Sequence, residues 1–257
     1  MEKSIDRVVE ILDRSHNTVV VTGAGISTEA GIPDFRGPEG IYRKLGENRV
    51  MNIINIDFFR NNPLEFYKFY RQYFIFPPVE PGKAHKVLAE MEKAGIIKAI
   101  VTQNIDNLHQ KAGSQKVIPI HGNGARFLCQ ERNCRSVHDS NYVNTYPEVI
   151  PRCSQCGSIL KPDVVLFGEH IKNYPDAMDR ILGARVLVVI GSSLTVYPLA
   201  GFVKEFSTFT QYLIIINKGP TPLDHAAVVK LQDGNTGELL EEIFAKIKKR
   251  RSFNSFN

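Results

Sequence analysis

The sequence lacks any apolar run of the roughly 18 residues that a membrane-spanning helix needs. It shows no tandem repeat, and residues 1–13 are charged and amphipathic, without the apolar centre of a signal peptide. We therefore expect a cytoplasmic protein with no membrane partner. Cysteine is scarce, with four in 257 residues, and in that compartment metal binding is a better expectation than disulfide formation.

Neither sign of charge is in large excess. The 32 Lys and Arg against 27 Asp and Glu leave a net charge of +5. This balance suits an anionic ligand but does not by itself indicate nucleic acid. The hydrophobic fraction of 43% is ordinary for a globular protein, and 257 residues allow one large domain or two modest ones.

Near-continuous apolar runs alternate with amphipathic stripes along most of the chain. Strands are expected at 18–21, 96–101, 117–120, 186–190 and 213–216. Helical stripes are expected at 5–12, 84–91 and 239–247. This alternation predicts an α/β fold, with a parallel sheet covered by helices on both faces.

Two segments interrupt the alternation and are expected to build a second, smaller domain. Residues 48–76 are aromatic-rich and expected to be helical, and 127–161 hold all four cysteines. The predicted division assigns 1–35, 81–124 and 162–250 to the larger domain, 36–80 and 125–161 to the smaller domain, and 251–257 to a basic and polar tail. From Lys246 onward the chain is expected to be frayed or disordered.

The cysteines form two short pairs. They are Cys129 and Cys134, followed after 18 residues by Cys153 and Cys156. Two such hairpins supply the four soft donors of a closed, tetrahedral, structural Zn²⁺ site. Four unrelated buried thiols are the alternative, which this spacing disfavours. His138 and Asp139 lie between the pairs and are interpreted as loop residues, since four thiolates already fill the tetrahedron.

A glycine turn follows the first expected strand. Gly23-Ala24-Gly25 lets backbone N–H groups approach a pyrophosphate at a helix N-terminus, although such a turn is also common without a ligand. The next residues, 28–38, carry acids, Phe35 and Arg36 between Pro and Gly, and form a candidate lid over a ligand. The third glycine of G-x-G-x-x-G is missing, which disfavours a hydride-transferring dehydrogenase.

Polar side chains also follow two other strands. Gln103, Asn104 and Asp106 come directly after 96–101, where an open α/β sheet binds ligands, so they can read a ribose and a carboxamide. A helix N-cap is the alternative for Asn104 or Asp106. His121 ends the run 117–120, where an imidazole can serve as a general base near neutral pH.

These segments, in this order, resemble the sirtuin family. The resemblance spans about residues 22–217 and is carried by GAGISTEAGIPDFRGPEGIY (23–42), TQNIDNLH (102–109), HG (121–122), the cysteine quartet, VVLFGE (164–169), GSSLTVYP (191–198) and IIN (215–217). Bacterial and archaeal members look most similar. The resemblance implies a Rossmann-like NAD domain and a small zinc domain, with a peptide substrate in the cleft between them.

The resemblance also implies roles for individual residues. Catalysis would fall to His121 and Asn104. NAD would be bound by Gly23, Ala24, Gly25, Thr28, Asp34, Phe35, Arg36, Gln103, Asn104, Ile105, Asp106, His121, Gly191, Ser192, Ser193, Asn217, Lys218 and Leu231. The substrate backbone would be bound by Val164, Val165, Leu166, Phe167, Gly168 and Glu169.

The implied activity is NAD-dependent protein-lysine deacetylation. NAD is consumed: nicotinamide leaves, the acyl oxygen attacks the anomeric carbon, and His121 deprotonates a ribose hydroxyl that then attacks the amidate carbon. Partners would be acetylated-lysine proteins or peptides, among them chromatin-associated or nucleic-acid-associated proteins. Family members that prefer acidic acyl groups carry Tyr-x-x-Arg, whereas Arg71 follows Tyr67 by four residues here, so acetyl is favoured.

Three other functions stay open at this point. A protein ADP-ribosyltransferase would use the same NAD site with another acceptor. A longer-chain deacylase would differ only in the acyl pocket. A non-catalytic module that binds zinc and nucleic acid is suggested by the cysteines and by KIKKRR (246–251), although most basic tails are simply solvated.

Overall fold

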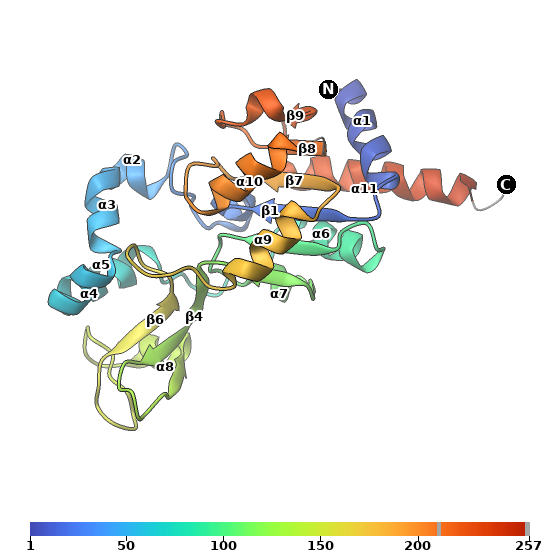
Figure 1. The fold of residues 1–257 in the computed structure, drawn as a ribbon. Helices are drawn as coiled ribbons and strands as arrows, with labels where there is room; N and C mark the ends of the chain where they lie inside the picture. The colour runs from blue at the N-terminus through green and yellow to red at the C-terminus, as the bar shows by residue number, and fades with distance from the viewer. Residues whose placement is uncertain (210–211, 255–257) are drawn as a thin grey trace.

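The computed structural model describes residues 1–209 and 212–254. Within them, the larger sheet has six strands, all parallel, in the order β3-β2-β1-β7-β8-β9. These strands are β1 (Thr18–Thr22), β2 (Ala99–Thr102), β3 (Val117–Pro119), β7 (Val186–Ile190), β8 (Tyr212–Ile216) and β9 (Val229–Leu231). The predicted parallel α/β sheet is confirmed (Figure 1).

Helices cover both faces of this sheet because alternate strand residues point to opposite sides. Val20 and Val188 pack into one core cluster with α1, α6 and α11, whereas Val19 and Leu187 pack into another with α9 and α10. The helices and short 3₁₀ turns of this domain are α1 (Glu2–Asp13), η1 (Ala24–Ala30), α6 (Lys83–Lys93), α7 (Leu108–Lys111), α9 (Tyr174–Leu182), α10 (Leu199–Thr208), η2 (Asp224–Ala226) and α11 (Thr236–Asn254).

The two segments that interrupt the alternation lie together at one end of the sheet (Figure 1). Together with the residues that flank them, they contain α2 (Ile41–Leu45), α3 (Glu47–Ile53), α4 (Ile56–Asn61), α5 (Pro63–Tyr73), β4 (Gly122–Cys129), β5 (Val137–Asp139), α8 (Ser140–Thr145) and β6 (Leu160–Val164). The strands form an antiparallel sheet in the order β5-β4-β6. Phe66 and Tyr67 of α5 share a hydrophobic core with Phe127 of β4 and Leu160 of β6.

The helix predicted after the glycine turn is present, as a 3₁₀ helix over Ala24–Ala30. One local expectation differs from the structure. The expected fraying from Lys246 is wrong as far as Asn254, because α11 continues to that residue. Ion pairs explain the order: Lys246 contacts Asp6 at 2.7 Å, and Arg251 contacts Asp13 at 2.9 Å. Residues 255–257 lie outside the described part of the chain.

In the described residues, no helix is both long and apolar enough to cross a bilayer.

Candidate functional site

A cavity of about 870 Å³ opens where β1, β2, β7 and β8 end. The residues that follow these strands, Gly23, Gln103, Gly191 and Asn217, all line it. Such a crevice outside the carboxyl ends of parallel strands is where open α/β sheets bind ligands. The cavity also extends to His121 beside the smaller sheet, so it spans both sheets.

Most of the site residues predicted from the sequence meet in this cavity. Those that line it are Gly23, Ala24, Gly25, Thr28, Asp34, Phe35, Arg36, Gln103, Asn104, Ile105, His121, Val164, Val165, Leu166, Phe167, Gly168, Glu169, Gly191, Ser192, Ser193, Asn217 and Lys218. Asp106 and Leu231 do not line it. The carboxylate of Asp106 accepts bonds from Ser27 Oγ at 2.7 Å and Leu108 N at 2.9 Å, and the carbonyl of Leu231 accepts from Asn217 N at 3.0 Å.

The glycine turn packs directly against the turn after β7. Gly25 N donates to Gly191 O at 2.9 Å, and a Cβ on Gly25 would lie 2.8 Å from Gly191 Cα. A Cβ on Gly23 would lie 2.8 Å from Gly191 O. Glycine is therefore required here for the contact between two loops, in addition to any close approach of a phosphate.

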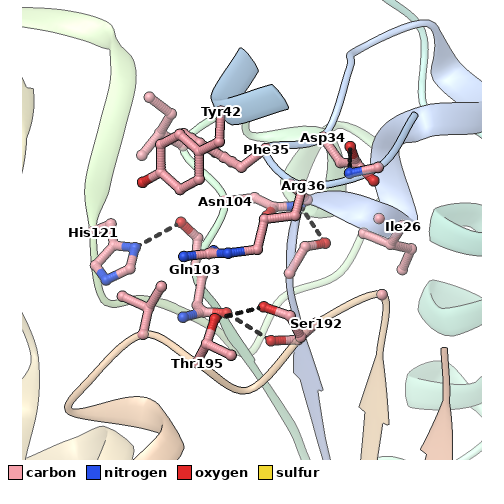
Figure 2. Close-up of a pocket in the computed structure, with 18 of the residues that line it drawn as sticks. Ile26, Asp34, Phe35, Arg36, Tyr42, Gln103, Asn104, His121, Ser192 and Thr195 are labelled. Atoms are coloured by element: carbon pink, nitrogen blue, oxygen red, sulfur yellow. Dashed lines mark hydrogen bonds between the residues drawn. The ribbon is translucent and has the colours of Figure 1, made fainter. Parts of the chain in front are cut away.

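The polar loop after β2 is fixed on both sides. Gln103 Oε1 accepts from Ser192 Oγ at 2.9 Å, which ties the loop to the end of β7. Asn104 Nδ2 donates to Gly23 O at 3.2 Å and to Ser27 Oγ at 3.1 Å, which ties it to the glycine turn. Figure 2 shows Gln103 and Asn104 between Phe35, Arg36 and Ser192. These amides are thus held in place before any ligand arrives.

His121 is oriented by the same loop. Its ring Nδ1 lies 3.0 Å from the carbonyl oxygen of Gln103, which can only accept, so Nδ1 carries the proton and donates (Figure 2). Nε2 is then the basic nitrogen. Burial lowers the pKa of His121, and the bond to Gln103 only partly opposes this. The imidazole is therefore neutral near pH 7 and able to accept a proton.

Phe35, Arg36 and Tyr42 form the opposite wall of the cavity. The rings of Phe35 and Tyr42 meet edge to face with centroids 5.3 Å apart. The guanidinium of Arg36 lies 4.8 Å from the Tyr42 ring centroid and pairs with Glu47 at 2.5 Å. This places an apolar ring and a cation at the mouth, the pair that the loop 28–38 was predicted to bring.

The segment 164–169 leaves β6, runs along the cavity as far as Phe167 and then turns at Gly168, whose φ is 91°. Val165 N donates to His121 O at 2.9 Å, and Phe167 N donates to Ile54 O at 3.0 Å. Glu169 Oε2 accepts from Leu166 N at 2.9 Å and pairs with Lys161 at 2.9 Å. One edge of the segment is thus bonded to both halves of the molecule through the backbone N–H groups of Val165 and Phe167.

The four cysteines converge away from the cavity. Their Sγ atoms all lie within 4.8 Å of one another, with Cys129–Cys156 at 3.4 Å and Cys134–Cys153 at 3.6 Å. A tetrahedral Zn²⁺ with Zn–S bonds of about 2.3 Å needs sulfur atoms roughly 3.8 Å apart. The donor set and its spacing fit structural zinc, as the sequence predicts. None of the four lines the cavity.

The Sir2 family model matches residues 23–198. This chain belongs to the Sir2 family. It is 45% identical to an NAD-dependent protein deacetylase of Saccharolobus solfataricus over 227 residues, which cover 86% of this chain and 89% of that protein. It is 40% identical to NAD-dependent protein deacylase 2 of Archaeoglobus fulgidus, over 98% of this chain and 99% of that protein.

A solved structure of Sir2 with a deacetylated p53 peptide and 3′-O-acetyl ADP ribose has the same fold, with a TM-score of 0.87 at 38% identity. The match covers 94% of this chain and 98% of that one. The resemblance to sirtuins read from the sequence is thereby confirmed.

The cavity is also lined by residues that were not predicted from the sequence. Tyr42 and Thr195 lie inside the segments that carried the resemblance, so a signal for them was present. Tyr70 and Phe74 are four residues apart and thus share a face of the aromatic-rich helix α5 and its end. Thr236 reaches the cavity because α11 begins there, and no local pattern indicates that.

Proposed function

We propose that this chain is an NAD-dependent protein-lysine deacetylase, which transfers the acetyl group of an acetylated lysine to ADP-ribose and releases nicotinamide. The observation that supports this most directly is the position of His121. Its Nδ1 donates to Gln103 in the loop after β2, and its own carbonyl accepts from Val165 in the segment after β6. A neutral base therefore lies between the loop that would bind NAD and the backbone segment that would bind the peptide.

NAD would bind as a substrate along the strand ends. The N–H groups of 23–25 and the cation of Arg36 suit the pyrophosphate. Ser192, Ser193 and Asn217 follow the neighbouring strands and suit phosphate and the adenosine ribose. The nicotinamide end would take its ribose contacts from Gln103 and Asn104, its carboxamide contacts from Ile105 and Asp106, and its shielding from Phe35. Lys218 and Leu231 remain predictions for the adenine end.

The peptide would bind as an added strand on Val164–Glu169. Main-chain bonds along such an edge give affinity without reading much sequence. The proposed ligand of this edge is an acetyl-lysine peptide. The same proposal includes a chromatin-associated or nucleic-acid-associated protein as the substrate, and a cytoplasmic location for the enzyme.

An uncharged acyl group fits the cavity wall formed by α5. Arg71 donates to the carbonyls of Val143 at 3.0 Å and Glu148 at 3.2 Å, and does not line the cavity. The Tyr67 hydroxyl donates to Leu160 O, so it too is engaged elsewhere. The α5 side chain that does line the cavity, Tyr70, is aromatic, which favours acetyl over an acidic acyl group.

His121 would accept the proton of a ribose hydroxyl at Nε2 once nicotinamide has left. The hydroxyl oxygen then bonds to the former amide carbon, and water completes the release of lysine and O-acetyl-ADP-ribose. General-base assistance of this kind contributes about 10²–10⁴-fold. Gln103 would keep the tautomer that leaves Nε2 basic.

Mass spectrometry of an acetyl-lysine peptide, incubated with and without NAD, tests the proposal. We expect deacetylation only with NAD, together with equal amounts of nicotinamide and O-acetyl-ADP-ribose. His121→Ala should lose about 10²–10⁴-fold in turnover, while His16→Ala, an exposed histidine before β1, should not. Purified protein that releases no nicotinamide in the presence of the peptide would refute the proposal. Label transferred from NAD to protein would favour the ADP-ribosyltransferase.

A further inference from the structure

Two histidines lie behind the polar loop and have no part in the chemistry described above. His85 of α6 is 0% exposed and His109 of α7 is 1% exposed. Their rings meet at a centroid distance of 4.8 Å. Among the described residues, the Nδ1 atom of each ring is buried without a hydrogen-bond partner. Each such atom costs roughly 1–3 kcal/mol, so an ordinary core position would favour an apolar residue.

His109 connects to the loop through two threonines. The Thr22 hydroxyl donates to Thr102 Oγ1 at 2.8 Å, so its oxygen must accept from His109 Nε2–H at 2.9 Å. Thr102 Oγ1 also accepts from Asn104 N at 3.0 Å. A continuous chain of hydrogen bonds therefore joins the buried imidazole to the backbone of Asn104, and it converges on Thr102 Oγ1 from both sides.

His85 connects to the same loop through Ser27. The Ser27 hydroxyl donates to Asp106 Oδ2 at 2.7 Å and accepts from Asn104 Nδ2 at 3.1 Å. Its one hydrogen is thus used, and His85 Nε2, at 3.5 Å, can approach it only as a donor. The second imidazole therefore reaches the side chains of Asn104 and Asp106.

Both rings are neutral donors under physiological conditions. Burial lowers the pKa of His109 to about 3, with a further lowering from His85. Burial also lowers the pKa of His85, although the carboxylates of Asp106 and Glu29 oppose this. Each neutral ring has one N–H, and the contacts above place both on Nε2.

We propose that His85 and His109 act as paired positioning residues, whose Nε2–H groups set Asn104 and Asp106 through Ser27 and Thr22. This inference rests on the proposed function, because in that function the rate depends on how accurately Asn104 and Asp106 are positioned. A shift of about 1 Å at a reacting centre can cost ~10²-fold in rate. The two histidines would thus control turnover without touching either substrate.

Amide substitutions test this role. His109→Gln keeps an N–H donor near the position of Nε2, His109→Asn offers its amide near Nδ1, which faces no partner, and His109→Leu has no donor. We expect kcat to fall by ~10²-fold in the Leu and Asn variants and to recover in the Gln variant. The same series at His85 should follow the same order, and a double Leu variant should lose less than the product of the two single losses.

His16→Leu is the control, since His16 is exposed and precedes β1. Thermal unfolding shows whether a variant has lost stability instead of loop geometry. The Gln and Asn variants place similar polar amides in the same buried site, so we expect similar stability from both and a difference only in kcat. If the Leu variant does not fold, the Gln and Asn pair decides. Equal kcat values in those two variants, or wild-type kcat in the folded Leu variant, would overturn the proposal.

A failure of the proposed function gives a different result. In that case the wild-type chain itself would leave an acetyl-lysine peptide unchanged in the presence of NAD. The variant series is then measured by the Kd for NAD, and the same order, with Gln near wild type and Asn and Leu weaker, is required. An unchanged Kd across the series would overturn the positioning role.

Discussion

Removal of zinc should unfold the smaller domain and abolish deacetylation, even though the cysteines do not line the cavity. Cys129 ends β4, whereas Cys153 and Cys156 precede β6. A metal bound by all four cysteines therefore joins the central strand β4 of the β5-β4-β6 sheet to the segment that leads into its neighbour β6, at the end remote from His121.

The magnitude follows from comparing two free energies. A structural Zn²⁺ contributes about 10–16 kcal/mol of apparent binding free energy at neutral pH. A whole domain is stable by only about 5–15 kcal/mol. The hydrophobic core that β4 and β6 share with α5 is small, so the sheet should not persist without the metal. Because β6 continues into 164–169, the proposed peptide edge would be lost with it.

The assay compares native protein with protein dialysed against a chelator. We expect one zinc per chain by emission spectroscopy before dialysis and none after it. Hydrogen exchange should lose protection over 122–164, while β1, β7 and β8 stay protected, and turnover should vanish. Cys134→Ala should reproduce the chelated state, and Ser154→Ala, an exposed serine between the last two cysteines, should not.

The reasoning would be refuted by metal-free protein that keeps both its protection over 122–164 and its turnover. Recovery of both on adding back Zn²⁺ would separate metal loss from irreversible damage.

Three further predictions concern protons, backbone and a cation. The pKa values of His109 and His121 are lowered in the folded chain, so the unfolded chain binds more protons below pH 6.5. The free energy of unfolding should therefore fall as pH drops from about 6.5 toward 3, measured by urea titration, and turnover should hold until pH is below about 6.5. Gly122→Ala should lower the free energy of unfolding by ~2–5 kcal/mol, because φ at this position is 90° and an added Cβ would lie 2.1 Å from Asp163 O. Gly113→Ala is the control: its φ is 102°, but no atom beyond the adjacent residues lies within 4 Å of an added Cβ, so the loss should be only ~1–2 kcal/mol. Arg71→Met should destabilise by ~1–3 kcal/mol in the same titration, because its guanidinium donates to three carbonyls, and Lys68→Met at an exposed position should change little.

Five of the six described strands of the larger sheet were predictable because both faces of the sheet are covered; β9 (Val229–Leu231) was missed, because Lys230 interrupts its short apolar run. The run 186–190 is the strand β7 without adjustment, and 18–21 falls one residue short of β1. Each of these five strands contains a continuous apolar run, and the residues that follow it mark the ligand edge. The same logic brought Gln103, Asn104 and Gly191 to one cavity.

Other features depended on long-range contacts that no local pattern reports. The basic end of α11 is ordered by Asp6 and Asp13, about 240 residues earlier in the chain. The helix after the glycine turn is tightened to 3₁₀ in a segment that packs on Gly191. The role of His109 was not predicted, although the residue ends the segment TQNIDNLH, because its threonine partner Thr22 lies 87 residues earlier in the chain.

The backbone pairing between β4 and β6 has a mechanical consequence. Gly122 is paired with Val164, and Val165 N is bonded to His121 O, so the base and the peptide edge belong to one ladder. Any displacement of this ladder would therefore move the imidazole and the peptide edge together. We therefore expect a bound peptide to keep its alignment with the imidazole while the nucleotide product departs.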